Sequence, residues 1–76
     1  MPKLPIVNGR DIVKILVHVG YSFDRQKGSH LIMIKKGCRS IPVPNHRPVS
    51  CRTVEAIIKQ SGMTKENFIK MYKDFL

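Results

Sequence analysis

The segment YSFDRQKGSHLIMI, residues 21–34, decides the fold. Its first five residues, 21–25, alternate apolar and polar side chains, which is the pattern of a half-buried strand. Gly28 and Ser29 then interrupt that pattern. Leu31–Ile34 is an unbroken apolar run of the length of one buried strand. We therefore expect two consecutive strands joined at a glycine turn.

A third strand follows on the C-terminal side of this segment. Residues 39–43 alternate again, and Pro42 favours an edge strand because proline cannot donate a hydrogen bond to a neighbouring strand. The short connection over residues 36–38 suits a hairpin. The three strands in sequence predict an antiparallel sheet.

Helices flank the three strands on both sides. The first is expected over residues 8–19, capped by Asn8 and stopped at Gly20. A second begins after a cap at Ser50 or Thr53 and ends at Gly62, and a third follows Thr64. The apolar residues repeat at helical spacing and predict the helical part of the core: Ile12, Ile15, Leu16, Val19, Val54, Ile57, Ile58, Phe68, Met71, Tyr72 and Phe75. The predicted class is α+β, a small antiparallel three-stranded sheet in the order α-β-β-β-α-α, packed on one face by helices.

Length and charge restrict the function. A chain of 76 residues has room for one domain, residues 1–76 with a core over about 8–69, and not for a large active site. Fourteen Lys and Arg against five Asp and Glu give a net charge of +9, and residues 31–60 alone carry six basic and one acidic side chain. Such an excess on a folded surface is typical of proteins that bind nucleic acid. A membrane surface or an acidic protein is the less favoured partner.

Other classes of protein find little support in the sequence. No apolar stretch approaches the roughly 20 residues of a membrane-spanning helix, and no secretory signal is present, so we expect a cytoplasmic protein without membrane contact. Cys38 and Cys51 are too few for a disulfide framework and lack the spacing of zinc ligands. We expect half-buried thiols, no metal and no cofactor.

One constellation in this chain is suited to chemistry on RNA. Gly28 permits close approach of the backbone to a phosphate, Ser29 can donate a hydrogen bond to it, and Arg25 and Lys27 bring positive charge. His30 is the side chain type that titrates near neutral pH, and strand alternation places it on the same face as Ile32 and Ile34.

These groups suit RNA cleavage without a metal ion. An imidazole removes the proton of a ribose 2′-OH, the alkoxide attacks the adjacent phosphorus, and cations stabilise the pentacoordinate phosphate. His30 is the candidate general base or acid. His46 is a possible acid for the leaving oxygen, although the sequence does not establish that it faces His30. The RNA-binding set predicted from this central segment is Arg25, Lys27, Gly28, Ser29, Lys35, Lys36, Arg39 and His46.

The order of these motifs resembles the HicA-type toxins of bacterial and archaeal toxin–antitoxin modules. The resemblance covers about residues 8–69 and is carried by Val19–Phe23, Arg25–His30, Leu31–Ile34, Val43–His46 and the segment from Thr53 to Met63. It implies a fold like that of double-stranded-RNA-binding domains and an endoribonuclease, an mRNA interferase, that cuts messenger RNA and blocks translation. It also implies that His30 is the catalytic residue and that a HicB-type antitoxin is the partner.

Two other functions remain open from the sequence. The chain has the size and charge of a non-catalytic module that binds double-stranded RNA by its shape. It could also dock on an acidic protein, which by itself would not distinguish the alternatives because a toxin binds its antitoxin. Cleavage of RNA by the free protein separates both from the ribonuclease.

Overall fold

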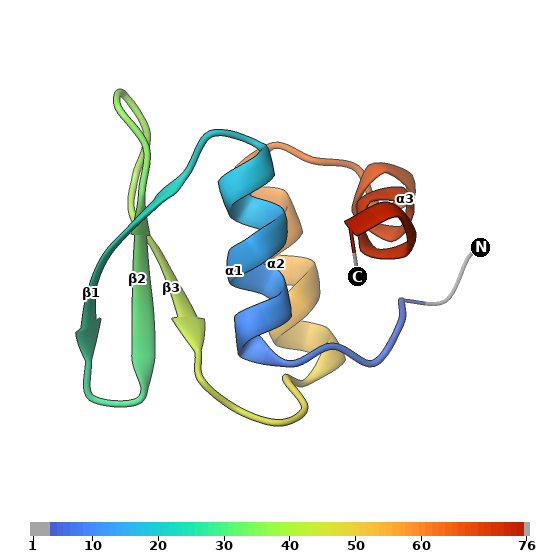
Figure 1. The fold of residues 1–76 in the computed structure, drawn as a ribbon, viewed down its shortest axis with the longest axis horizontal. Coiled ribbons are helices and arrows are strands. Elements are labelled where there is room, and N and C mark those ends of the chain that lie inside the picture. Colours follow the sequence, from blue (N-terminus) through green and yellow to red (C-terminus); the bar gives the residue numbers. More distant parts are fainter. Residues whose placement is uncertain (1–3, 76) are drawn as a thin grey trace.

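The elements follow one another in the predicted order. The computed structural model describes residues 4–75 and contains, in sequence, α1 (Gly9–His18), β1 (Ser22–Lys27), β2 (His30–Ile34), β3 (Ile41–Pro44), α2 (Cys51–Ser61) and α3 (Lys65–Phe75). The strands form one antiparallel sheet in the order β1-β2-β3 (Figure 1). The predicted α+β class and the edge position of the strand that contains Pro42 are confirmed.

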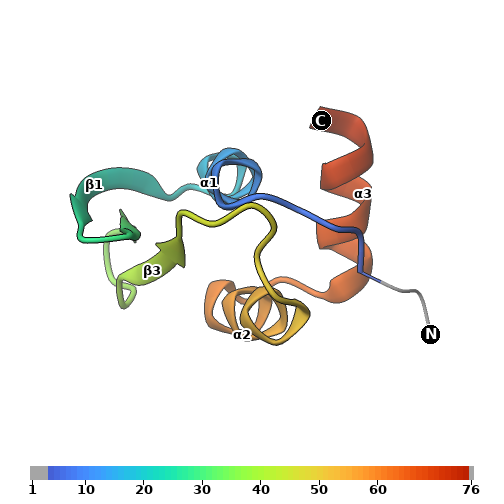
Figure 2. The same cartoon turned by 90° about the horizontal axis from the view of Figure 1, so that it is seen from below.

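The sheet has one buried and one open face. Leu31 and Met33 of β2 are buried together with Ile41 and Val43 of β3, whereas the neighbours of opposite parity in β2 are exposed or half-buried. Helices α1 and α2 lie against the buried face, and α3 lies on the far side of this helical pair (Figure 2). The order of layers is therefore sheet, helix pair, third helix.

The core contains most of the residues that helical spacing predicted. Ile12, Ile15, Leu16, Val54, Ile57, Ile58 and Phe68 are all buried, and Val19, Met71 and Tyr72 are half-buried against them. Phe75 differs because it is 48% exposed and stacks on the ring of His18, with 3.7 Å between ring centroids. It therefore covers the end of α1 instead of entering the core.

Local signals explain where the helices end. At the end of α1, Gly20 takes a φ of 101°, its N–H donates to the Val17 carbonyl, and the Tyr21 N–H donates to the Leu16 carbonyl. This pair of bonds is the glycine stop of a Schellman motif. Of the two caps that the sequence left open for α2, Ser50 occupies the position, with its Oγ accepting from the Thr53 N–H at 3.4 Å.

Two predictions about the strands were wrong in detail. The first strand is not half-buried: all six residues of β1 are exposed, and only Tyr21 just before it is buried. The reason is that β1 forms the outer edge of the sheet, beyond the edge of the helical layer (Figure 1). The third strand starts at Ile41, because Arg39 and Ser40 belong to the connection between β2 and β3.

Candidate functional site

His30 is the first residue of β2 and lies on the open face of the sheet. It is exposed, as is Ile34, while Ile32 between them is half-buried, so the predicted shared face is confirmed. Its neighbours across the sheet are Lys27 of β1 and Pro44 of β3. Directly opposed residues in an antiparallel sheet have Cβ atoms about 4.5–5.5 Å apart, so the lysine lies beside the imidazole.

A bulge in β1 places a second cation on this face. Phe23 pairs with Met33, and the next paired residue is Arg25, opposite Ile32, so Asp24 is the extra residue. The register shift turns Arg25 and Lys27 to the face of His30, whereas Phe23 faces the helices. Arg25 is diagonal to His30, a separation of roughly 7–8 Å that a long side chain spans.

The cation at residue 25 has a carboxylate neighbour. Arg25 Nη1 donates to Asp24 Oδ2 at 3.0 Å, and the arginine side chain is 67% exposed. An exposed ion pair of this kind contributes little to stability. Its effect is instead to reduce the positive charge that Arg25 presents to a phosphate.

The turn before His30 is a tight hairpin. Lys27 and His30 are paired directly, leaving Gly28 and Ser29 as the two central residues. Gly28 has a φ of 60° and Ser29 does not have a positive φ, which is the pattern of a type II′ turn. Nothing lies within 4 Å of a Cβ built on Gly28, so the backbone at the turn is open to a ligand.

Backbone hydrogen bonds join this turn to two other segments. The Asn45 N–H donates to the Ser29 carbonyl at 2.7 Å, and the Gly9 N–H donates to the His46 carbonyl at 3.0 Å. A side chain at Gly9 would collide with the Pro44 carbonyl, so the glycine allows this approach. The turn, the loop after β3 and the start of α1 consequently meet at one end of the molecule, and His46 is exposed there.

Three residues of the predicted RNA-binding set lie elsewhere. Lys35, Lys36 and Arg39 follow the other end of β2, roughly 16 Å from His30 at about 3.3 Å per residue. Figure 1 shows this connection at the opposite end of the sheet from the turn. The structure thus divides the predicted set. Five members lie at the end of the molecule that contains His30, namely Arg25, Lys27, Gly28, Ser29 and His46, and the other three lie at the opposite end.

Lys35 has a structural role at that distant end. Its Nζ donates to the Val19 carbonyl at 3.0 Å and lies 5.5 Å from the centre of the Tyr21 ring. Burial, with a smaller contribution from Cys38, raises the pKa of the Tyr21 hydroxyl. Lys35 therefore ties the end of β2 to the C-terminus of α1.

Sequence reasoning did not assign three arginines that occupy the end of His30. Arg10 is the second residue of α1, Arg47 follows His46, and Arg52 is the second residue of α2. Both helices begin at this end of the molecule (Figure 1). No linear motif marks these residues, because hydrogen bonds between distant segments bring Arg10 and Arg47 to this end and the orientation of α2 brings Arg52 there.

Other parts of the structure offer less for chemistry. Within residues 4–75, no three His, Cys, Asp or Glu side chains are grouped as metal ligands. Both cysteines are free and exposed, so the expectation of half-buried thiols was wrong; each lies outside the helix–sheet interface, in a connection or at the start of α2. No helix in the same residues is long and apolar enough to cross a membrane.

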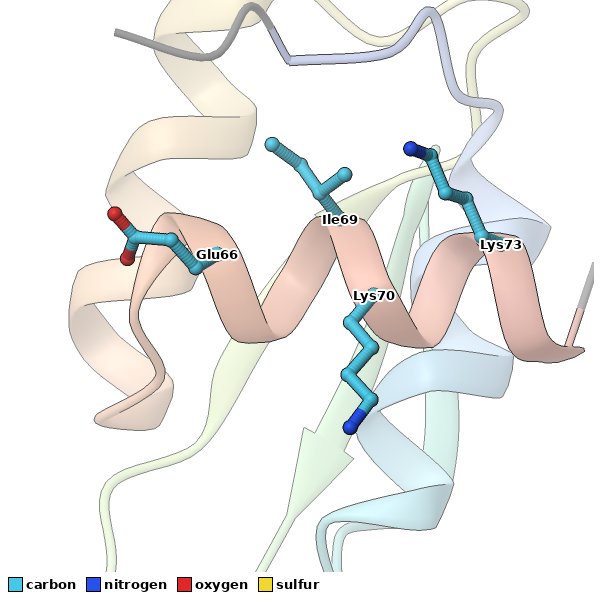
Figure 3. A pocket seen from close by; sticks show the side chains of 4 residues that line it. All are labelled: Glu66, Ile69, Lys70 and Lys73. Carbon is cyan, nitrogen blue, oxygen red and sulfur yellow. The ribbon is translucent and has the colours of Figure 1, made fainter.

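A separate hollow of about 290 Å³ lies on α3, far from the sheet, and is lined by Glu66, Ile69, Lys70 and Lys73. Ile69 and Lys73 project to one side of the helix and Lys70 to the other (Figure 3). The hollow has a single carboxylate and no histidine among its lining residues, so it lacks the groups of an acid–base site.

Comparison with known proteins indicates the family of the chain. A solved structure described as "Toxin-Antitoxin complex from Streptococcus pneumoniae" matches with a TM-score of 0.70 and 35% sequence identity, over 78% of this chain and 100% of that one. A search of curated proteins found no match. The family model described as "HicA toxin of bacterial toxin-antitoxin" matches residues 9–63, which include all three strands, α1, α2 and His30. The chain belongs to the HicA toxin family.

Proposed function

We propose that this protein is the toxin of a toxin–antitoxin pair and acts as an endoribonuclease on messenger RNA, which would place its action in the cytoplasm. The observation that carries the proposal is the position of His30. It is an exposed histidine on the open face of the sheet, with Lys27 opposite and Arg25 diagonal to it. A base and cations are thereby arranged around a space that a phosphodiester can enter.

The proposed reaction is transfer of the phosphoryl group to the neighbouring 2′-oxygen. The imidazole of His30 accepts the proton of the 2′-OH, the O2′–P bond forms and the P–O5′ bond breaks. Lys27 and Arg25 stabilise the negative charge that develops on the equatorial oxygens. The products are a 2′,3′-cyclic phosphate and a 5′-OH, and the leaving oxygen receives a proton from an acid, for which exposed His46 is the candidate.

The test uses purified protein, a labelled single-stranded RNA and a chelator. We expect wild type to cleave the RNA and to leave cyclic phosphate ends. His30→Ala should reduce the rate by about 10²–10⁴, the contribution of a general base. Because His30 is exposed, its loss should leave the circular dichroism spectrum unchanged.

His18→Ala is the matched control, since His18 is an exposed histidine on α1 that stacks on Phe75. It should retain the wild-type rate. RNA with a 2′-deoxy sugar at the cleaved position should be inert. Cleavage by His30→Ala at the wild-type rate would contradict the role of His30, and binding of duplex RNA without cleavage by wild type would favour a non-catalytic binding module.

An antitoxin partner follows from the same family membership. The solved structure that matches this chain is described as a toxin–antitoxin complex. We propose that an acidic antitoxin, of the HicB type, covers the basic end that contains His30. Such a partner should protect RNA from cleavage when it is added in equimolar amounts.

A further inference from the structure

A groove between α1 and β1 lies on the helix side of the sheet, around the edge from His30. It has a volume of about 370 Å³, which is within the range of small-ligand sites, about 300–1,000 Å³. Its lining comes from three elements: Arg10, Val13, Lys14, Phe23, Gln26 and Leu31. None of these residues was assigned a function by the sequence or by the proposed reaction.

The most unusual lining residue is an aromatic ring. Phe23 is 53% exposed although it is on the helix side of the sheet, opposite the fully buried Met33. An exposed phenyl ring with an open groove beside it offers a face on which a planar ring can stack. Val13 and Leu31, which are half-buried and buried, add apolar surface to the groove.

The polar residues that line the groove can bind the phosphates of a nucleotide and the polar edge of its base. Arg10 and Lys14 are exposed and lie one helical turn apart on α1, on the same side of the helix. They can hold phosphates on either side of a stacked base. Gln26 donates from Nε2 to the Gly28 carbonyl at 3.1 Å, and the same amide carries an oxygen that can accept from a base amino group.

The groove and the site of His30 are neighbours along the hairpin, on opposite faces of the sheet. Gln26 pairs with Leu31 and the next pair along the hairpin is Lys27 with His30, so the groove and the site are one residue apart on opposite faces. Arg10 is at the end of α1 where the Gly9 N–H donates to the His46 carbonyl. A single RNA strand that passes around the turn can therefore contact both.

We propose that this groove binds one unstacked nucleobase of the RNA, by stacking on Phe23 between Arg10 and Lys14. The inference rests on the proposed ribonuclease function and adds a subsite that positions the strand relative to His30. A base inside a duplex has both faces covered by its neighbours, so the groove selects single-stranded RNA over a duplex.

The experiment measures RNA binding in a His30→Ala background, which prevents cleavage. Phe23→Ala should weaken binding of single-stranded RNA between about fivefold and about 100-fold, the range found for loss of one base–aromatic stack. Phe75→Ala is the matched control, because Phe75 is a similarly exposed phenylalanine at the far end of α3, and it should bind like the background.

A direct reading of stacking is available because the chain has no tryptophan. Phe23→Trp introduces one fluorophore into the groove, and its emission should be quenched as single-stranded RNA is added, while Phe75→Trp should stay unchanged. Circular dichroism of each variant confirms that the exposed substitutions leave the fold intact.

The outcomes separate this inference from the proposed function. If the background binds RNA but Phe23→Ala binds equally well and Phe23→Trp is not quenched, the groove is not a base site and the proposed function stands. If Phe23→Ala retains RNA but loses an acidic protein partner, the occupant is protein and the inference is overturned. If wild type cleaves no RNA and the background binds none, the proposed function fails and the base site fails with it.

Discussion

At the scale of single residues, the neighbours of each charged group determine how much positive charge the site presents to RNA. His30 has Lys27 as its direct neighbour, whereas Arg25 is shared between the open face and the Asp24 carboxylate at 3.0 Å. Asp24, which carries this carboxylate, is also the extra residue of the bulge that turns Arg25 to the open face. Asp24 thus positions a cation by its backbone and weakens that cation by its charge.

Asp24→Asn should strengthen RNA binding. Removal of the carboxylate leaves Arg25 unpaired, and we expect affinity to rise by up to about fivefold at low salt, which corresponds to about 1 kcal/mol. The stability should change by less than about 1 kcal/mol because the pair is exposed. Fluorescence anisotropy with labelled RNA in the His30→Ala background measures the change.

The control for this prediction is Glu66→Gln, which removes one negative charge from α3 on the far side of the helical layer. It should raise affinity much less. Equal effects of the two variants would indicate that only the net charge matters and that Asp24 does not act on Arg25.

At the scale of elements, α3 is joined to the domain through its core side chain. The family match ends at residue 63, before α3 begins at Lys65. Phe68 is nevertheless fully buried, and Thr64 caps the helix by accepting from the Asn67 N–H at 3.1 Å. The helix therefore completes the core of this chain although it lies outside the matched region.

Phe68→Ala should destabilise the whole domain. Truncation of a buried phenylalanine typically costs about 3–5 kcal/mol, a large part of the roughly 5–15 kcal/mol that stabilises a protein domain. Urea denaturation followed by circular dichroism should show a single transition at lower urea. Phe75→Ala, half-exposed on the same helix, should shift the midpoint far less, and a similarly small shift for Phe68→Ala would show that α3 is an appendage.

At the scale of the whole molecule, several segments meet at the end that contains His30. The hairpin turn, the loop after β3 and the first turn of α1 are joined there by backbone hydrogen bonds, and α2 begins at the same end. The segments joined by these bonds carry Arg10, Arg25, Lys27 and Arg47, and Arg52 is the second residue of α2. The partial positive charges of two helix N-termini add to the same field.

This arrangement predicts that removal of a cation changes the salt dependence of RNA binding on one side of the molecule and not on the other. Lys27→Gln should reduce the slope of log affinity against log salt by about 0.7, the value for one phosphate contact on a single strand. Lys73→Gln, an exposed lysine on α3, should leave the slope unchanged. A titration at four salt concentrations measures both, and an equal loss of slope in the two variants would refute a directional binding surface.

The sequence by itself determined the elements, because their signals are local. Helical spacing, the cap at Asn8, the cap at either Ser50 or Thr53, the glycine stops at Gly20 and Gly62, and the break at Gly28 each act within a few residues. The shared face of His30 and Ile32 follows in the same way from strand alternation within β2. The family resemblance, which rests on the order of these local motifs, was also readable at this level.

Only the tertiary structure decided which cations lie beside His30. The bulge at Asp24 determines which side chains of β1 point to each face of the sheet. Simple alternation would have placed Phe23, Arg25 and Lys27 on one face. The two ends of β2 separate Lys35, Lys36 and Arg39 from the histidine, while the approach of Gly9 to the loop after β3 places Arg10 at the same end of the molecule as the histidine. These are contacts between segments far apart in sequence or shifts of register, and their energies depend on packing that no local pattern contains.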